Sequence, residues 1–418
     1  MADLVRRNIA DLARGALDHF PVVVIQGVRR AGKSTLAGEL ASERSCVSVS
    51  LDDDETRASA TEDPATLLEP ARSGQLIVID EIQRVPDLVL AVKAEVDRAQ
   101  QPGRFILTGS SDFLALPQIP DSLAGRAATI RLRPFSQGEL AGRREDFVSR
   151  ILDGLDGVAD VSSPWKRADY AEAAWRGGYP EPLALDEPWR TMWLDSYVER
   201  MTSRDAQSVS ERVSAERLRV VLRLLAANQA GELVKTRVAR DAGISDTSVT
   251  TCLDTLKTLF LVDTIPPWTA NLAKREIGRP KAVVSDPGLA LYLSRISRAQ
   301  LTSDQGGDWL GHTLEGLVTT ELLKQRAWSS TRWELSHYRD RNGLETDAVV
   351  ELDDGRVILL EVKASATYRS EHFEPMRKMA EQLGDRLVAG IVLTTADHGW
   401  RYTNTMAGLP ISALWQEW

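Results

Sequence analysis

The stretch Val22-Val-Val-Ile-Gln-Gly-Val-Arg-Arg-Ala-Gly-Lys-Ser-Thr35 decides the fold of the N-terminal part of this 418-residue chain. Its first five residues form a short apolar run, which is typical of a buried parallel strand. The next eight residues, Gly27–Ser34, fit the pattern GxxxxGK[ST]. A strand in front of this pattern and a helical stretch behind it predict a phosphate-binding P-loop; a plain glycine-rich turn is the simpler alternative.

The chemistry of a P-loop assigns a role to each kind of residue in it. The glycines let backbone N–H groups curl around a phosphate, Lys33 reaches the β and γ phosphates, and Ser34 offers its hydroxyl to Mg²⁺. We therefore expect ATP and Mg²⁺ as cofactors. The residues expected to bind the nucleotide are Gly27, Val28, Arg29, Arg30, Ala31, Gly32, Lys33, Ser34, Thr35 and Ser110.

Two further apolar runs end in polar residues that suit the same site. The run Gln75–Glu81 ends in two carboxylates, so that Asp80 would steady the Mg²⁺ shell and Glu81 would orient or deprotonate the attacking water. A solvated helix cap is the alternative, but the distance of about 45 residues behind a P-loop favours the catalytic interpretation. A later run ends before Ser110 and Ser111, and either hydroxyl is a candidate sensor of the γ-phosphate.

The order of strands and helices predicts the architecture of this first domain. Apolar runs near 22–26, 46–51, 75–80, 104–108 and 129–133 alternate with helical stretches. Such a βα alternation predicts a parallel sheet wrapped by helices. The phosphate site should then lie at the carboxyl ends of the strands, where the motifs fall.

The motifs IQGVRRAGKST, LIVIDEIQ, FILTGSS and SLAGR in series resemble the AAA+ ATPase superfamily, and more narrowly a bacterial and archaeal family in which a domain of uncharacterised function follows the ATPase. The resemblance covers residues 1–140 and implies ATP hydrolysis. It also implies that Arg126 acts as an arginine finger across a subunit boundary, hence a homo-oligomer. A surface arginine is the alternative.

Composition and charge set wider limits. With 43% apolar and 27% charged residues the chain is an ordinary globular mixture, long enough for two or three domains. The net charge of -9 does not exclude nucleic-acid binding through local basic patches. The two cysteines lack the spacing of a zinc site, and there is no apolar stretch of membrane-spanning length. We expect a cytoplasmic protein without a membrane partner.

The middle of the chain predicts helices. Residues 141–205 are expected to form a helical lid or connector, and 206–270 suggest a winged helix with helices near 214–227 and 235–242 and a third helix after Ser245. The exposed positions of the third helix are mostly acidic or hydroxyl-bearing, which favours packing or partner binding over reading a DNA groove. The basic stretch Lys274–Lys281 is a better candidate for phosphate contact, with a solvated loop as the alternative.

The C-terminal region contains a hairpin with charged residues on one face. If the turn is symmetric about Asp354, Asp347 lies opposite Glu361 and Glu345 lies opposite Lys363. Two carboxylates this close repel each other unless a divalent cation lies between them, and a neighbouring lysine could activate water. This pattern predicts metal ligation by Asp347 and Glu361 and a catalytic role for these two and Lys363.

The pattern of Asp347 followed by Glu361-Val-Lys363 resembles the restriction-endonuclease-like, PD-(D/E)xK, superfamily over about residues 305–395. The resemblance adds Glu315 as a further carboxylate and DNA as the expected partner. A surface ion-pair ladder, or a degenerate nuclease that only binds, would leave similar residues.

These patterns together predict an α/β protein in which the nucleotide state of an AAA+ parallel-sheet domain controls a nuclease-like α/β domain that binds or cleaves DNA. The alternative is a nucleotide-gated switch that recruits a protein partner, with the nuclease-like fold non-catalytic. The expected domains are 1–140 (ATPase), 141–205 (helical connector), 206–270 (winged helix) and 271–418 (restriction-endonuclease-like).

Overall fold

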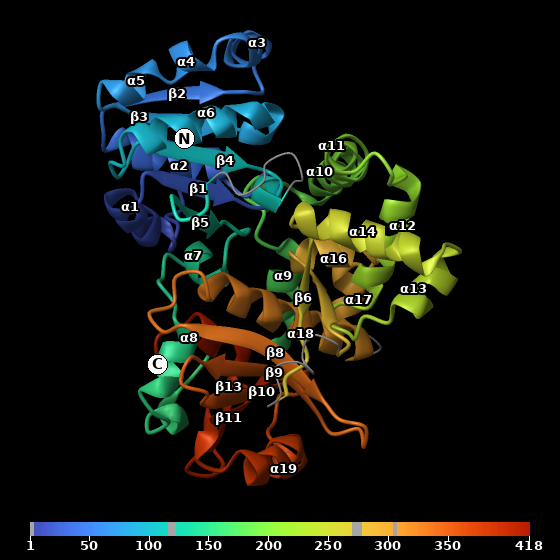
Figure 1. Cartoon of the computed structure of the whole chain (residues 1–418). Coiled ribbons are helices and arrows are strands. Elements are labelled where there is room, and N and C mark those ends of the chain that lie inside the picture. Colours follow the sequence, from blue (N-terminus) through green and yellow to red (C-terminus); the bar gives the residue numbers. More distant parts are fainter. Residues whose placement is uncertain (1–3, 116–122, 270–277, 304–306) are drawn as a thin grey trace.

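The computed structural model of the protein describes residues 4–115, 123–269, 278–303 and 307–418. The N-terminal part is built on a five-stranded sheet in the order β2-β3-β4-β1-β5, in which all neighbours run parallel (Figure 1). Its strands are β1 (Val22–Gln26), β2 (Cys46–Ser50), β3 (Leu76–Asp80), β4 (Phe105–Gly109) and β5 (Ala127–Arg131). The predicted parallel sheet is confirmed.

Helices cover both faces of this sheet, and its interior strand β1 is apolar on both sides. Val23 and Ile25 of β1 pack in one core with α1 (Ala10–His19) and α2 (Lys33–Ser42). Val22 and Val24 pack in a second core with α6 (Pro86–Arg98). The short helices α3 (Asp54–Glu62), α4 (Pro64–Leu67) and α5 (Glu69–Arg72) complete this layer, and α7 (Gln137–Leu140) follows β5.

A helical body follows the sheet domain and includes a small two-stranded sheet. Its elements are α10 (Glu187–Arg200), a π-helical turn (Met201–Asp205), α11 (Ala206–Val209), α12 (Ala215–Ala227), α13 (Lys235–Ala242), α14 (Asp246–Thr258), β6 (Val262–Ile265), β7 (Lys281–Val284), α16 (Pro287–Leu293) and α17 (Arg298–Thr302). The helices α12, α13 and α14 lie where the sequence predicts them. Strands β6 and β7 pair antiparallel behind α14. The winged-helix interpretation stays a prediction, and Lys274 and Arg275 lie outside the described residues.

The C-terminal domain is a mixed six-stranded sheet in the order β12-β13-β11-β10-β9-β8. Its elements are α18 (Gly307–Gln325), β8 (Trp333–Arg339), β9 (Glu345–Leu352), β10 (Val357–Lys363), α19 (Glu374–Leu383), β11 (Leu387–Thr394), β12 (Trp400–Arg401) and β13 (Met406–Pro410). Helix α18 packs with the residues of one sheet face and α19 with those of the other. In the described part of the chain, no helix combines the length and apolar character that a membrane span needs.

The register of the β9–β10 hairpin is the predicted one. Leu360 pairs with Ala348 and Val357 pairs with Glu351, so the hairpin is symmetric about Asp354. Continued by one residue, the same register brings Asp347 opposite Glu361. The restriction-endonuclease-like fold itself stays a prediction for this domain.

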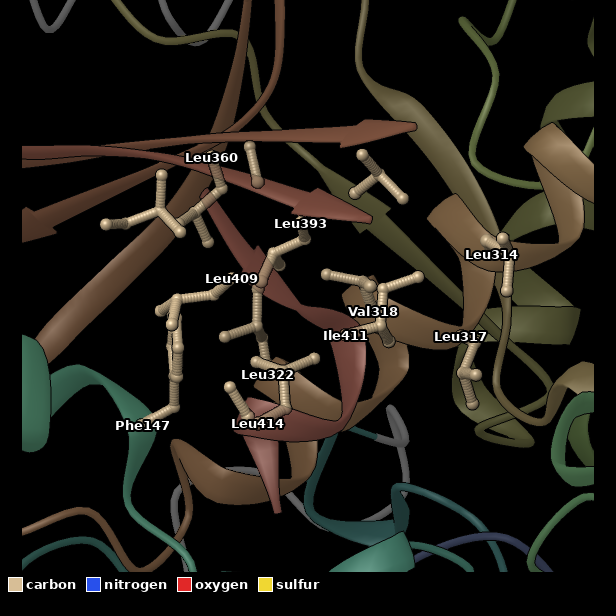
Figure 2. Close-up of a cluster of buried hydrophobic side chains, with 14 of the residues drawn as sticks. Phe147, Leu314, Leu317, Val318, Leu322, Leu360, Leu393, Leu409, Ile411 and Leu414 are labelled. Carbon is tan, nitrogen blue, oxygen red and sulfur yellow. The ribbon is translucent and has the colours of Figure 1, made fainter. Parts of the chain in front are cut away.

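The segment expected to be one helical connector contributes to two different cores. Helices α8 (Phe147–Leu152) and α9 (Arg167–Arg176) pack into the core of the C-terminal domain, and Phe147 belongs to the same cluster as Leu360, Leu409 and Leu414 (Figure 2). Helix α10 packs instead with the middle helices. An amphipathic pattern indicates that a helix has a buried face but not which surface covers it. The expected domain limits stay predictions.

Buried charges join the first domain to α18. Lys324 and Glu321 form an ion pair of 2.7 Å, with side chains exposed by only 1% and 0%. The Lys324 Nζ also donates to the carbonyl oxygen of Phe135 (3.0 Å), and Glu321 accepts from the backbone N–H of Gln137 (2.8 Å). Since each charge neutralises the other and also contacts the chain just after β5, the pair fixes this joint.

We predict that Lys324→Met lowers the free energy of unfolding by about 3–5 kcal/mol, because Glu321 then keeps a buried charge without its partner. Chemical denaturation measures the change. The matched control is Lys378→Met, which breaks the exposed ion pair with Glu374 and should cost under about 1 kcal/mol. Equal effects of the two substitutions would contradict the assignment.

Candidate functional site

The loop between β1 and α2 has backbone conformations and close contacts that favour glycine at particular positions. Gly32 lies in the left-handed region (φ 94°), and Arg30 does so too (φ 65°). A Cβ atom on Gly27 would lie 2.0 Å from the backbone oxygen of Leu132. The loop therefore lies tightly against the chain that follows β5, and α2 begins at Lys33 with its first backbone N–H groups free for an anion, as a P-loop requires.

Lys33 is held inside this loop. Its side chain is buried, and its Nζ donates to the backbone oxygen of Val28 (3.1 Å). Burial lowers the pKa of Lys33 to about 8, although the nearby carboxylates of Glu81 and Asp80 oppose the shift. A phosphate oxygen in the loop would offer Lys33 a charged acceptor in exchange for a neutral one.

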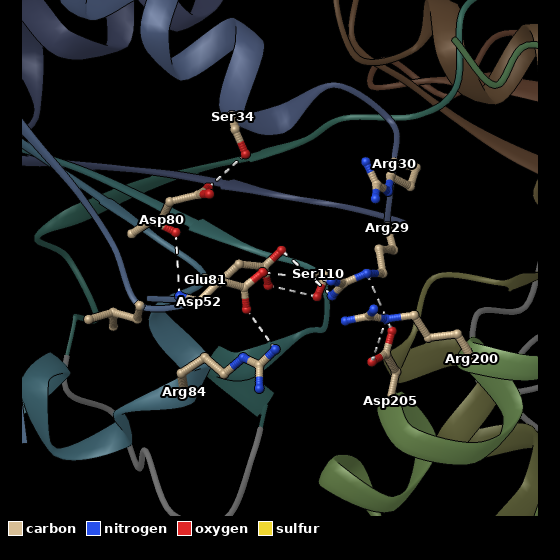
Figure 3. A network of polar contacts seen from close by, with 12 residues as sticks. Arg29, Arg30, Ser34, Asp52, Asp80, Glu81, Arg84, Ser110, Arg200 and Asp205 are labelled. Carbon is tan, nitrogen blue, oxygen red and sulfur yellow. Dashed lines mark hydrogen bonds and ion pairs between the residues drawn. The ribbon is translucent and has the colours of Figure 1, made fainter. Parts of the chain in front are cut away.

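The carboxyl ends of β3 and β4 bring the predicted polar side chains to the P-loop (Figure 3). The Ser34 hydroxyl donates to Asp80 Oδ1 (2.9 Å), and the Ser110 hydroxyl donates to Glu81 Oε2 (2.9 Å). The oxygens of Ser34 and Asp80 thus converge, as Mg²⁺ coordination would require, and the donor set fits this ion. The structure brings together every residue predicted for this end of the site.

Two residues of this network were not predicted. The Thr108 hydroxyl hydrogen-bonds Asp80 and accepts from the backbone N–H of Glu81 (3.1 Å). Gln83 donates to Ser110 (3.0 Å) and also to Glu81. Glu81 itself has a positive φ of 57°, a strained conformation that such contacts must hold in place. The sequence feature that could have predicted the role of Thr108 is its position near the end of β4, the strand that pairs with β3.

The middle helices contact the P-loop directly. Arg29 lies between the two bodies, with its guanidinium 3.9 Å from Glu81 and 3.7 Å from Asp205 (Figure 3). Asp205 ends the π-helical turn, a rare element that often marks functional sites. Val28 and Ala31 of the loop belong to the apolar core of the middle helices. The loop is therefore joined to this body through both charge and packing.

Arg126 lies away from the phosphate site of its own chain. It precedes β5 and its backbone oxygen accepts from Val22, so it is at the amino ends of the strands, opposite the P-loop. Its side chain pairs with Asp97 at 2.6 Å. Ser122 of the same motif lies outside the described residues. The finger role stays a prediction and requires the site of another copy.

The C-terminal hairpin brings its predicted residues together as well. The Lys363 Nζ lies 2.6 Å from Glu361 Oε1, and Asp347 Oδ2 accepts from the backbone N–H of Val362 (2.8 Å). Burial, and then the Asp347 charge, raises the pKa of Glu361 to about 7. Glu361 Oε2 is buried and accepts no hydrogen bond from any described residue. A divalent cation between Asp347 and Glu361 would satisfy this oxygen, so the two residues fit such an ion.

Lys281 also enters this cluster, which corrects the expectation that it belongs to a phosphate-contacting or solvated loop. Its Nζ lies 2.5 Å from Glu315 Oε1 and 3.7 Å from Asp347 Oδ1. Burial, and then the Asp347 charge, raises the pKa of Glu315 to about 8. Across the described ranges, no three His, Cys, Asp or Glu side chains are grouped closely enough to hold a metal ion by themselves.

The first domain belongs to a class that its fold and site define, the AAA-type P-loop ATPases: residues 19–141 match the family described as AAA domain. The chain as a whole is a member of the same family as protein Rv2008c of Mycobacterium tuberculosis, with which it shares 30% identity over 98% of its own length and 84% of the relative. Protein Mb2031c of Mycobacterium bovis matches equally. Residues 167–300 and 310–414 match two domains of unknown function, DUF8612 and DUF4143.

Solved structures resemble this chain only with low TM-scores and low sequence identities. The Walker-type ATPase PABY2304 of Pyrococcus abyssi has a TM-score of 0.42 at 17% identity, over 70% of this chain and 96% of that one. AMPPCP-bound DnaA from Aquifex aeolicus has a TM-score of 0.29 at 13% identity, over 59% of this chain and 86% of that one. Neither assigns a role to a residue here.

We predict that ATP binding takes up a proton at alkaline pH. Below about pH 8 Lys33 is already charged in the free protein, whereas above it the neutral lysine must gain a proton to pair with phosphate. Affinity should therefore fall as the pH rises through this value. Calorimetry at about pH 9 in buffers of different ionisation enthalpy should detect uptake of up to about one proton. Equal heats in all buffers would contradict the prediction.

Proposed function

We propose that this protein binds and hydrolyses ATP in its first domain and that the nucleotide state controls a metal-dependent, nuclease-like site in its C-terminal domain, which binds or cleaves DNA. The observation that carries the first part is the convergence of Lys33, Ser34, Asp80, Glu81 and Ser110 at the carboxyl edge of one parallel sheet. The second part rests on the β9–β10 hairpin.

In the proposed ATPase each residue acts through what it touches. Backbone N–H groups of the loop and Lys33 bind the phosphates, while Ser34 and Asp80 would hold Mg²⁺, which supplies positive charge to the β and γ phosphates. Glu81 orients the attacking water or accepts its proton. Ser110 and Gln83 position the Glu81 carboxylate by the hydrogen bonds already formed in the protein.

We predict that Glu81→Gln keeps ATP binding but slows turnover by about 100-fold or more, because the amide is not a base. Nucleotide affinity and phosphate release measure the two effects. Glu62→Gln, an exposed glutamate on α3, is the control and should leave both unchanged. Normal turnover in Glu81→Gln would remove Glu81 from the proposed mechanism.

Contacts between the bodies support control by nucleotide. Beyond the link from Arg29 to Asp205, the backbone N–H of Asp112, just after the sensor serines, donates to the backbone oxygen of Thr258 at the end of α14 (2.8 Å). Arg133, after β5, pairs with Asp263 on β6 (2.5 Å). The phosphate site is thus joined to the middle body at several points.

The proposed C-terminal chemistry follows from the carboxylates and the lysine of the hairpin. Asp347 and Glu361 would hold a divalent cation, which polarises a phosphodiester and lowers the pKa of a bound water. Lys363, which is 39% exposed and lies 2.6 Å from Glu361, would stabilise charge on the phosphate. The Asp347 carboxylate is held by the backbone N–H of Val362 at Oδ2, and its Oδ1 lies 3.7 Å from Lys281 Nζ.

We predict cleavage of DNA in the presence of Mg²⁺ or Mn²⁺ that Asp347→Asn abolishes and Asp353→Asn, in the exposed hairpin turn, preserves. Single- and double-stranded DNA and RNA are each tested with and without ATP. Cleavage that responds to ATP in the wild type but not in Lys33→Ala would support nucleotide control. No cleavage, with intact ATP turnover, would contradict the nuclease part.

A nucleotide-gated interaction switch is the second candidate, favoured by two surfaces of the middle body. The third helix exposes Asp246 and Asp254, which suits DNA poorly. Helix α10, which leads directly to Asp205, exposes Trp189 (60%) and Met192 (58%). ATP-dependent protein capture that Trp189→Ala weakens, without salt-sensitive DNA binding, would favour this candidate.

A further inference from the structure

Lys281 is a buried cation that one body of the protein supplies to the carboxylates of another. It begins β7, where it pairs with Ile265 of β6, and its side chain is 5% exposed. Its Nζ lies 2.5 Å from Glu315 Oε1 and 3.7 Å from both Glu345 Oε1 and Asp347 Oδ1. The ammonium group therefore lies among three carboxylates of the C-terminal domain.

This arrangement has an energetic reason. A buried ammonium is costly unless its charge is compensated, and neighbouring carboxylates repel each other unless a cation lies between them. Lys281 meets both conditions at once on the Glu315 side of the cluster. In many carboxylate sites a divalent cation meets them instead.

The opposite side of Asp347 is different. Within the described part of the chain, Glu361 Oε2 is buried without a hydrogen bond, and the ion-pair partner of Glu361 is Lys363, whose side chain is 39% exposed. The carboxylate oxygen that lacks a partner is thus on the Glu361 side of Asp347. On the Glu315 side, Lys281 already neutralises the carboxylates.

We propose that Lys281 serves as a fixed internal cation of the C-terminal site, which takes the position among Glu315, Glu345 and Asp347 and leaves room for one divalent cation, between Asp347 and Glu361. The inference rests on the metal site of the proposed function and goes beyond it by limiting that site to one ion. Because Lys281 lies on β7, the middle body then contributes a residue to the C-terminal site.

The position of Lys281 depends on the first domain as well. Strand β6, which pairs with β7, carries Asp263, and Asp263 is held by Arg131 (2.8 Å) and Arg133 (2.5 Å) at the end of β5. Strand β5 pairs with β1, which leads into the P-loop. The internal cation is therefore carried by a ribbon whose other strand is tied to the nucleotide-binding sheet.

The test measures Mn²⁺ binding to the full-length protein without nucleotide, by calorimetry and by the paramagnetic resonance of free Mn²⁺. Asp347→Asn defines which ions bind at the C-terminal site. We expect one Asp347-dependent ion in the wild type and in Lys281→Arg. We expect a second ion, or binding at least about tenfold tighter, in Lys281→Met, because a competing charge is removed. The double variant Lys281→Met with Glu315→Gln should lose this gain.

Unchanged number and affinity of Mn²⁺ in a folded Lys281→Met protein would overturn the proposal. Circular dichroism and thermal melting show whether Lys281→Met folds. If it does not, Lys281→Gln, which removes the charge but keeps a hydrogen-bond donor to Glu315, replaces it, and the same outcomes of Mn²⁺ binding are expected. A wild type that binds no Asp347-dependent ion, with a Lys281→Met variant that does, would support the internal cation and contradict the proposed metal-dependent nuclease. No binding in either protein would contradict both.

Discussion

A charge buried in a protein must be neutralised by the protein itself, and this constraint determines how the parts of this chain are joined. Lys324 and Glu321 meet it between the first domain and α18. Lys281 meets it between β7 and the C-terminal carboxylates. Each of these charges would be costly if the bodies moved apart without a new partner, so the joints favour a defined geometry over loose tethering.

The sequence predicted the features that depend on short-range order. The strand ends and P-loop around Lys33 follow from apolar runs and glycines, and the register that brings Asp347 opposite Glu361 follows from the turn at Asp354. The contact of Lys281 with Glu315 could not be predicted, because it depends on how the β6–β7 ribbon packs against α18. Nothing local distinguishes a lysine that enters another domain from one in a solvated loop.

The two candidate sites differ in how their charges are arranged. At the P-loop, Lys33 donates to a neutral backbone oxygen and the helix amino end is free, so the site is prepared for an incoming anion. In the hairpin, carboxylates exceed the lysines near them, which suits a cation. Arg29 of the P-loop contacts Asp205 of the middle body, and Lys281 of the β6–β7 ribbon contacts Glu315 of the C-terminal domain.

The packing of α8 and α9 has a consequence for how this protein can be divided. These helices come before the middle body in the chain but pack in the core of the last domain (Figure 2). The C-terminal sheet is thus completed by a segment that the chain delivers more than a hundred residues earlier. A gene fragment that starts at α18 would encode a domain whose core lacks the apolar side chains of α8 and α9, so recombination that transfers this unit intact must carry both segments together.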